Sequence, residues 1–388
     1  MFRSIHKLAA FAAGAALLVA GCGGASSGGS VGGSGRIIVN VGVSNPFSGP
    51  SAFAGLEAVK GVQLAVAELN KRQKKYEFVT SVADDECTPD GGRAALTKLT
   101  EVDRVNVVLT SNCSGAVLGS MSVLQQQGIP GVVTAATAAA ITEQAGVGGN
   151  KYIFRINSMD TMFAQQFSKY IAAAGVRKIA FLAVNNDYGR GLVQAFAPEF
   201  HKLGIQVTTQ QFFQQGSPDF RPQLTAINAS GAQAILAPAQ YPDMIAILRQ
   251  MKELGLKQRV FARADVVSPA FLAAAGDPHL GDGIVEATYW DPTLSSDPGF
   301  SAMLKARFGS APSLNAYVTY WGMKVIYQAI LNGGGAAPGQ ILKGLQRMDY
   351  QTPLGRIKFN NHNQAQSDVF IVGLVNGQIK LIERVHTS

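Results

Sequence analysis

Residues 37–72 read IIVNVGVSNPFSGPSAFAGLEAVKGVQLAVAELNKR, and this stretch decides the fold class. Its opening is rich in β-branched side chains, which predicts a buried strand over residues 37–44. The apolar residues that follow recur at spacings of three and four, which predicts a helix over residues 51–72 with one apolar face. They are Phe53, Leu56, Val59, Val62, Val66 and Leu69. A short strand followed closely by an amphipathic helix is the unit of an α/β fold.

The same unit repeats along the chain in two series. The first continues with strands at residues 78–83, 105–110 and 129–133 and helices at 92–102 and 115–127. The second begins near Met159, with helices at 161–174, 191–203, 220–229 and 241–254 and strands at 178–184, 206–213, 234–237 and 260–262. Short connections between alternating strands and helices predict two lobes, each a doubly wound parallel sheet with right-handed crossovers.

The alternation weakens after Tyr289. Two more helices are predicted at residues 317–331 and 338–345, and the chain ends in strands at 355–359 and 369–383. Asn376-Gly377 interrupts the last of these and predicts a hairpin turn. Ligands of open α/β sheets bind beyond the carboxyl ends of the strands, so the tips after the first, third and fourth strands are the first candidates for a site.

The N-terminus carries an export signal. Arg3 and Lys7 precede an apolar run at residues 8–20, and this run is shorter than the roughly 20 residues of a membrane-spanning helix. Val19-Ala20-Gly21-Cys22 follows and resembles the lipobox of bacterial lipoproteins, in which the cysteine is lipidated and becomes the mature N-terminus. The alternative is an ordinary signal peptide with an incidental cysteine. We therefore expect a signal peptide at 1–21 and a flexible Gly/Ser tether at 22–35.

Length and charge set further limits. The chain has 388 residues, enough for two or three domains at roughly 150 residues each. A hydrophobic fraction of 47% with 15% charged residues excludes a disordered or coiled-coil protein. The 33 basic and 25 acidic residues give a net charge of +8, which becomes +6 once residues 1–21 and their two basic side chains are removed. Apart from the short group Lys71-Arg72-Gln73-Lys74-Lys75, the basic residues are mostly scattered singly, which argues against nucleic-acid binding.

Two cysteines, Cys87 and Cys113, lie in the exported part. Thiols in an oxidising compartment pair more often than they stay free. The alternative is a metal or nucleophile role, but the chain has no C-x-x-C motif and its five histidines are dispersed. We expect no metal and no cofactor.

Catalytic motifs are missing from the sequence. No HExxH or phosphate-binding G-x4-GK[ST] pattern occurs, and GxSxG occurs only inside the Gly/Ser tether, at residues 24–28 and 28–32, where no strand–turn–helix context is expected. No catalytic residue is therefore assigned, and an enzyme is not expected. Asp84-Asp85-Glu86 is the densest acidic cluster. It would suit a metal, but we interpret it as a solvated strand end.

Small hydroxyl residues stand at two predicted strand ends instead. Ser111, Ser114 and Gly115 precede the third helix, and Thr134 and Thr137 follow the fourth strand. Free N–H groups at a helix start, with a hydroxyl beside them, can hold a carboxylate. The alternative is plain N-capping of the helix.

Five segments carry a family likeness. They are residues 41–62 (VGVSNPFSGPSAFAGLEAVKGV), Asp84-Asp85-Glu86-Cys87, residues 111–115 (SNCSG), Ala136-Thr137 and Asp187-Tyr188-Gly189-Arg190-Gly191. In this order and spacing the chain resembles the leucine/isoleucine/valine-binding proteins, type I periplasmic solute receptors of ABC importers, over roughly residues 36–385. Each motif alone is modest, and their combination is specific.

The resemblance implies two lobes joined by three hinge strands that close on a ligand. Lobe 1 would comprise residues 36–158 and 288–364, and lobe 2 residues 159–287 and 365–388. The family pattern also implies a Cys87–Cys113 disulfide. The ligand carboxylate would be held by the hydroxyls and backbone N–H groups of Ser114 and Thr137. The Ala135 carbonyl and the Thr137 hydroxyl would receive an α-ammonium.

The resemblance places three aromatic residues at the ligand. Tyr188 would cover it from lobe 2, Tyr241 lies beside a second family contact, and Phe53 falls near the aromatic residue of the first loop. Amino-acid binders of this family also carry an acid on lobe 2 that pairs with the ammonium. That position falls at Ala264, with Asp265 next to it, so a slip of one residue restores the carboxylate.

Without that acid a buried ammonium would lack its counter-ion, and the ligand would then be a non-amine such as an aromatic or aliphatic acid or an amide. Arg263 would suit an anionic ligand, unless it forms a surface salt pair.

The resemblance implies an extracytoplasmic lipoprotein of an ABC importer that captures a branched-chain amino acid or a related small carboxylate or amide. It would act as a monomer, held by its lipid in the periplasm or at the cell surface, and deliver the solute to the permease of the inner membrane. The alternative function is a regulatory or sensor lipoprotein with the same fold.

Overall fold

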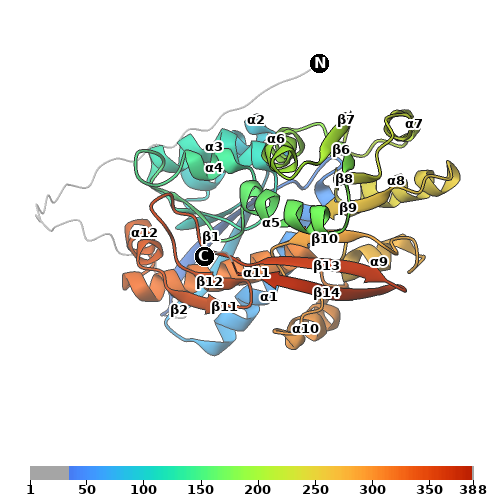
Figure 1. The fold of residues 1–388 in the computed structure, drawn as a ribbon. Helices are drawn as coiled ribbons and strands as arrows, with labels where there is room; N and C mark the ends of the chain where they lie inside the picture. The colour runs from blue at the N-terminus through green and yellow to red at the C-terminus, as the bar shows by residue number, and fades with distance from the viewer. Residues whose placement is uncertain (1–34, 387–388) are drawn as a thin grey trace, which may run out of the picture.

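The computed structural model describes residues 35–386, which contain two main sheets (Figure 1). The first sheet is parallel and has the strand order β2-β1-β3-β4-β5. Its strands are β1 (Ile37–Asn45), β2 (Tyr76–Asp84), β3 (Val107–Thr110), β4 (Gly131–Val133) and β5 (Ile153–Arg155). The helices of this part are α1 (Ala52–Arg72), α2 (Pro89–Thr97), α3 (Ser114–Gln127), α4 (Ala139–Glu143), α10 (Pro298–Phe308), α11 (Leu314–Gly333) and α12 (Pro338–Gln346). We call this sheet with its helices lobe 1.

The second sheet has the order β14-β13-β10-β9-β8-β6-β7. Its parallel strands are β6 (Lys178–Val184), β7 (Gln206–Phe213), β8 (Ala234–Pro238), β9 (Arg259–Arg263) and β10 (Val285–Thr288), while β13 (Val369–Val375) and β14 (Gln378–Val385) are antiparallel. Its helices are α5 (Asp160–Ala173), α6 (Asp187–Lys202), α7 (Arg221–Ala229), α8 (Tyr241–Glu253) and α9 (Pro269–Ala275). We call this part lobe 2. The predicted fold class, two doubly wound lobes, is confirmed.

Both faces of the lobe 1 sheet are buried. Val107 and Leu109 of β3 belong to the same core cluster as Val62 of α1, whereas Val108 packs in a second cluster with Val117 of α3. Successive side chains of a strand point to opposite faces. Helices on both faces therefore explain why these strands read as continuous apolar runs.

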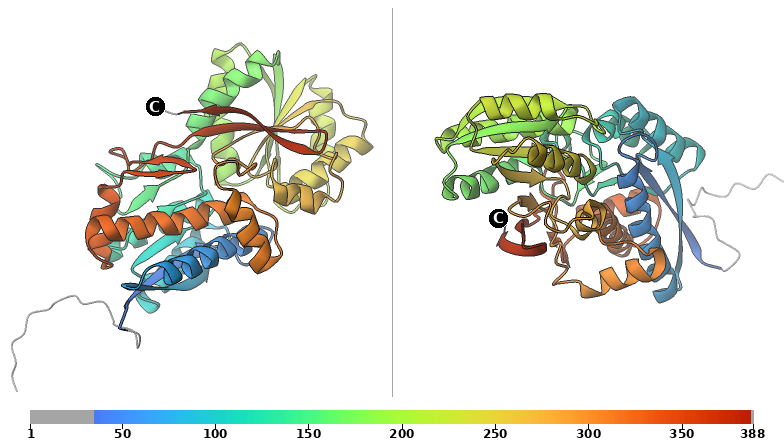
Figure 2. Two further views of the ribbon diagram at one scale, coloured as in Figure 1. Left: turned by 90° about the horizontal axis from the view of Figure 1, so that it is seen from below. Right: turned by 90° about the vertical axis from the view of Figure 1, so that its right-hand side faces the viewer.

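The chain passes between the lobes three times, from β5 to α5, from β10 to α10 and from β12 (Gly355–Ile357) to β13 (Figure 2). A short hairpin of β11 (Tyr350–Thr352) and β12 precedes the third crossing. Two of the crossings are joined by the hydroxyls of Ser158 and Ser367, 2.6 Å apart. The proposed residue boundaries of the two lobes stay a prediction, and Thr288 still lies within β10.

Several predicted elements differ from the structure. The helix predicted over residues 92–102 begins earlier, at Pro89 behind the capping hydroxyl of Thr88, and ends at Thr97, where a π-helical segment η1 (Lys98–Val102) replaces it. The sequence patterns missed β5, β10, β11, α4, α9 and α10. The hairpin at Asn376-Gly377 is confirmed, with both residues at positive φ between β13 and β14.

No helix among residues 35–386 is both long and apolar enough to cross a membrane. The predicted signal peptide, the tether and the lipid attachment at Cys22 lie outside the described residues.

Candidate functional site

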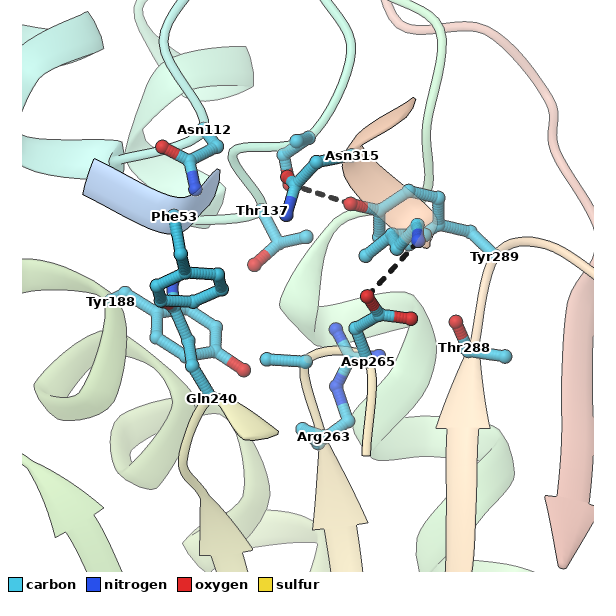
Figure 3. Close-up of a pocket in the computed structure, with 13 residues that line it drawn as sticks. Phe53, Asn112, Thr137, Tyr188, Gln240, Arg263, Asp265, Thr288, Tyr289 and Asn315 are labelled. Atoms are coloured by element: carbon cyan, nitrogen blue, oxygen red, sulfur yellow. Dashed lines mark hydrogen bonds between the residues drawn. The ribbon is translucent and has the colours of Figure 1, made fainter. Parts of the chain in front are cut away.

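A cavity of about 530 Å³, counting the space open to solvent, lies between the two lobes (Figure 3). Lobe 1 contributes residues that follow β3 and β4 or begin α1 and α11: Phe53, Asn112, Ala135, Thr137, Leu314 and Asn315. Lobe 2 contributes residues near the ends of β8, β9 and β10 and at the start of α6: Tyr188, Gln240, Arg263, Ala264, Asp265, Thr288 and Tyr289. The cavity thus lies where strand ends of both sheets face each other, as expected for open α/β sheets.

Five of the seven predicted ligand residues line this cavity: Phe53, Ala135, Thr137, Tyr188 and Asp265. The other two lie beside it. Ser114 lines an adjoining cavity, which shares Asn112, Tyr188 and Gln240 with the first. The ring of Tyr241 packs edge-on against Phe53, with ring centroids 5.0 Å apart, and does not line the cavity.

The turn after β4 presents Thr137 to the cavity. The Thr137 hydroxyl is buried and has no hydrogen-bond partner, while its carbonyl accepts a bond of 2.9 Å from the Asp160 N–H. The next residue, Ala138, donates its N–H to the Ser114 hydroxyl over 3.3 Å. The fully buried Arg155 supports the same turn from below by donating to the Ala138 carbonyl. Thr137 is therefore held by its backbone, and its hydroxyl lies close enough to the buried Asp160 carboxyl to lower the pKa of that group.

Ala135 is engaged within the protein. Its carbonyl accepts a bond of 3.0 Å from the Tyr289 hydroxyl, drawn in Figure 3, and one of 3.2 Å from the side-chain amide of Asn157. A carbonyl oxygen has two lone pairs, so these two bonds use its ordinary capacity.

Asp265 stands in a turn after β9 that needs positive φ at two residues, Ala264 (79°) and Asp265 (69°). The side chain is 3% exposed. Its Oδ2 accepts a bond of 3.0 Å from the Leu314 N–H, and its Oδ1 is buried without a partner. Burial first, and the nearby Glu286 carboxylate second, raise the pKa of Asp265 well above its usual range.

Arg263 is not the surface residue that a simple salt pair would require. It is 2% exposed, lies over the Phe163 ring with its guanidinium carbon 3.5 Å from the ring centroid, and places one nitrogen 3.7 Å from the buried Asp160 carboxylate. Its Nε has no hydrogen-bond partner. Burial raises the pKa of Asp160 and Arg263 lowers it, and burial also raises the pKa of Glu286. One cavity-lining guanidinium thus accompanies three buried carboxyl groups.

The disulfide implied by the resemblance is present. Cys87 and Cys113 join the turns after β2 and β3, with Cα atoms 5.2 Å apart, and Cys113 directly precedes Ser114 at the start of α3.

The neighbouring acidic cluster is only in part the solvated strand end that the sequence suggested, because Glu86 is exposed and Asp84 is partly exposed, whereas Asp85 is buried. Asp85 is 0% exposed and accepts bonds of 3.0 Å from the Ser44 hydroxyl and the Cys87 N–H, which satisfies its carboxylate inside the protein. Among residues 35–386, no group of three or more acidic, cysteine or histidine side chains is placed to hold a metal.

Close packing of α1 on α11 positions a part of the site that the sequence reasoning missed. At Gly61 of α1 a Cβ atom would lie 1.9 Å from the Ala316 carbonyl oxygen, so only glycine fits there. The Thr319 hydroxyl of α11 also donates to the Ala58 carbonyl over 2.8 Å. These contacts fix the start of α11, where Leu314 and Asn315 line the cavity.

The other missed residues are Asn112, Gln240, Thr288 and Tyr289. Asn112 lies within the quoted segment SNCSG, so the sequence motif could have identified it as a residue of the site. Thr288, Tyr289 and Asn315 fall where the strand–helix alternation fades, so no pattern marked them.

A cavity between two parallel-sheet lobes, joined by three chain crossings, defines a two-lobed receptor for small solutes. The chain belongs to the leucine/isoleucine/valine-binding family of type I periplasmic binding proteins, because the family model described as "Periplasmic binding protein" matches residues 38–378. Membership implies an extracytoplasmic location and a substrate-binding role.

Named relatives of the chain are about one-quarter identical to it. An amino acid binding protein and a leucine-, isoleucine-, valine-, threonine- and alanine-binding protein, both of Pseudomonas aeruginosa, are each 26% identical over 340 residues, which cover 86% of this chain and 89% of theirs.

Solved structures show the same fold. A leucine binding protein from Thermotoga maritima superposes with a TM-score of 0.79 at 22% identity, covering 90% of this chain and 99% of its own. A solute binding protein of an ABC transporter from Rhodopseudomonas palustris, in complex with 3,4-dihydroxybenzoic acid, superposes with a TM-score of 0.80 at 21% identity, covering 90% and 97%. The fold therefore accommodates both amino acids and aromatic acids, and the ligand class depends on the residues of the cavity.

Proposed function

We propose that this protein captures an α-amino acid in the cavity between its lobes and delivers it to the permease of an ABC importer. The observation that carries the proposal is the carboxylate of Asp265, which lines the cavity and keeps a buried oxygen, Oδ1, without a partner. A buried carboxylate is costly unless a cation or hydrogen-bond donors accompany it. The α-ammonium of an amino acid supplies both a charge and donors.

The charges of lobe 2 support an amine rather than a simple acid. Asp160, Asp265 and Glu286 are buried near the cavity, and the one guanidinium that lines it, Arg263, is already beside Asp160. A ligand that brought only a carboxylate would add negative charge next to Asp265 without neutralising it. Because the Ala135 carbonyl already accepts two bonds, we assign the ammonium contact to Asp265 rather than to Ala135.

The carboxylate end of the ligand belongs on lobe 1. The Thr137 hydroxyl has no partner, and Ser114 begins α3, where N–H groups and the positive end of the helix dipole favour an anion. The rings of Phe53 from lobe 1 and Tyr188 from lobe 2 both line the cavity, where they would enclose the carbon skeleton of the ligand (Figure 3).

The lipid anchor completes the proposed role. Cys22 would carry the lipid after removal of residues 1–21, and the tether would let a monomeric receptor reach the permease. Labelled lipid on the natural protein, lost in Cys22→Ser, is the expected result. Lipidation that persists in the variant would contradict it.

Calorimetric titration tests the ligand class. Natural protein should bind an α-amino acid more tightly than the matching des-amino acid, and Asp265→Asn should abolish that difference. Asp243→Asn serves as the control, because Asp243 is a buried aspartate that also accepts a backbone N–H, from Gly216, and does not line the cavity. Tighter binding of the des-amino acid by the natural protein would overturn the proposal.

Uptake of the bound amino acid by cells tests delivery to a permease. This uptake should be lost when the gene is deleted.

A further inference from the structure

Two buried polar side chains line the cavity without a hydrogen-bond partner among the described residues. Asn315, on the first turn of α11, is 7% exposed, and its amide points into the cavity (Figure 3). Thr288, at the end of β10, is 1% exposed. Both side chains line the open space of the cavity, so their hydrogen-bond partners come from that space, from water in the free protein and from a ligand when one is bound.

Two further amides lie around the same space. The Gln240 Oε1 accepts a bond of 3.1 Å from Gln215, which leaves the Gln240 amino group free to donate. The amino group of Asn112 has no partner among residues 35–386. Both side chains line the main cavity and the adjoining one. Lobe 1 and lobe 2 thus each present one buried polar side chain and one half-buried amide.

Aliphatic side chains are scarce in this cavity. Of its thirteen lining residues, only Ala135, Ala264 and Leu314 are aliphatic, and two of these are alanines. Most other apolar contact comes from the rings of Phe53, Tyr188 and Tyr289. A branched aliphatic group placed against the amides and hydroxyls would displace water from them without replacing their hydrogen bonds, which is costly.

We propose that the preferred ligand is an α-amino acid whose uncharged side chain both donates and accepts hydrogen bonds, a carboxamide or a hydroxyl, rather than a branched aliphatic one. Asn315 is the residue that determines this preference, with Thr288 assisting it. The inference rests on the proposed function of the cavity as an amino-acid site. An amide such as Asn315 has both donors and an acceptor, which is the complement of a carboxamide or hydroxyl.

Charged side chains fit this arrangement less well. A second carboxylate would lie near the buried acids Asp265 and Glu286. A second ammonium would lie near the Arg263 guanidinium, and the α-ammonium already uses Asp265 in the proposed binding mode. An uncharged polar side chain avoids both repulsions while it satisfies the free amides.

Isosteric ligand pairs give the test, because shape is held constant while hydrogen bonding changes. Asparagine is compared with leucine, and threonine with valine, by calorimetric titration of the full chain in detergent. We expect asparagine and threonine to bind at least tenfold more tightly than their partners. Leucine and valine binding as tightly as, or more tightly than, asparagine and threonine would overturn the inference while leaving the amino-acid site intact. Binding of benzoate but of no amino acid would overturn the proposed function itself.

Variants of two cavity residues test which side chain determines the preference for a polar ligand side chain. Asn315→Leu should reduce the asparagine-to-leucine ratio at least tenfold, whereas Asn332→Leu, on the same helix but outside the cavity, should leave it unchanged. Thr288→Val, a change of nearly constant volume, should reduce the threonine-to-valine ratio and keeps the inference testable if Asn315→Leu fails to fold. An unchanged ratio in a folded Asn315→Leu protein would contradict the assignment of Asn315.

Discussion

The backbone N–H of Leu314 donates a hydrogen bond of 3.0 Å to the Oδ2 atom of Asp265, and this bond joins the two lobes. A second interlobe bond runs nearby, from the Ala270 N–H to the Pro312 carbonyl over 3.1 Å. Asp265 therefore has two tasks in the proposed mechanism: Oδ2 holds lobe 1, and Oδ1 is left for the ligand. An ammonium that ionises Asp265 would also strengthen the Leu314 bond, because hydrogen bonds to charged acceptors are stronger. Ligand binding and lobe closure would then favour each other.

Amino-acid binding should depend on pH through Asp265. Its pKa is raised well above the usual range in the protein without ligand, and a ligand ammonium favours the ionised form. Below the raised pKa, binding must release the proton, so affinity should rise with pH until it levels off above that pKa. Titrations across the acid range check this, and the dependence should flatten in Asp265→Asn. An identical slope in both proteins would exclude Asp265 as the titrating group.

Stability without ligand should show the opposite trend. A carboxyl group whose folded-state pKa is raised stabilises the fold most below its ordinary pKa, and that stabilisation is lost as the pH rises through the raised value. Asp265→Asn imitates the protonated form at every pH. The variant should therefore melt at a higher temperature than the natural protein near neutral pH, although it binds amino acids less well. A lower melting temperature would mean that Asp265 is stabilised as an anion even without ligand.

Removing the two hydroxyls on the carboxylate side should weaken binding at least tenfold. The double variant Ser114→Ala with Thr137→Ala deletes about 1.4 kcal/mol or more of binding free energy if both contact the ligand. Thr134→Ala is the matched control, since Thr134 is equally buried in the same turn and does not line the cavity. Unchanged affinity in the double variant, measured by calorimetry, would place the carboxylate elsewhere.

The disulfide should stabilise lobe 1. Cys87 and Cys113 close a loop with a sequence separation of 26 residues, which the chain-entropy treatment values at about 3 kcal/mol. Reduction should lower the melting temperature of the natural protein and leave the double variant Cys87→Ala with Cys113→Ala unaffected. Equal responses of the two proteins to the reductant would show that its action lies elsewhere.

Local patterns in the sequence were enough to predict most of the fold. The strands predicted at residues 178–184 and 206–213 match β6 and β7 without a change of boundary, because both are long runs flanked by clear helices. Strand β5 has three residues, too few for a period to show, and it gains its hydrogen bonds from β4 and from the crossing at Gln364.

The candidate site was only partly predictable, for a physical reason. Thr137 and Tyr188 stand in motifs next to strand ends, so both were found. Asn315 enters the cavity because α11 packs on α1 through Gly61, a contact between segments some 250 residues apart that no local pattern records. The burial of Arg263, at the end of strand β9, likewise depends on a contact with the ring of Phe163 in helix α5.

The contact between Phe53 and Tyr241 should contribute to closure, because it joins the first turn of α1 in lobe 1 to the start of α8 in lobe 2 with ring centroids 5.0 Å apart. Edge-to-face pairs contribute about 1 kcal/mol, so Tyr241→Ala should weaken ligand binding roughly fivefold even though Tyr241 does not line the cavity. Phe53→Ala should weaken binding further, since Phe53 faces both the ligand space and Tyr241. A double-mutant cycle separates the effect of Tyr241 from that of Phe53. In a protein that already carries Phe53→Ala, the change Tyr241→Ala should cause no further loss of affinity. Full additivity of the two variants would show that Tyr241 acts on the ligand by a route other than Phe53.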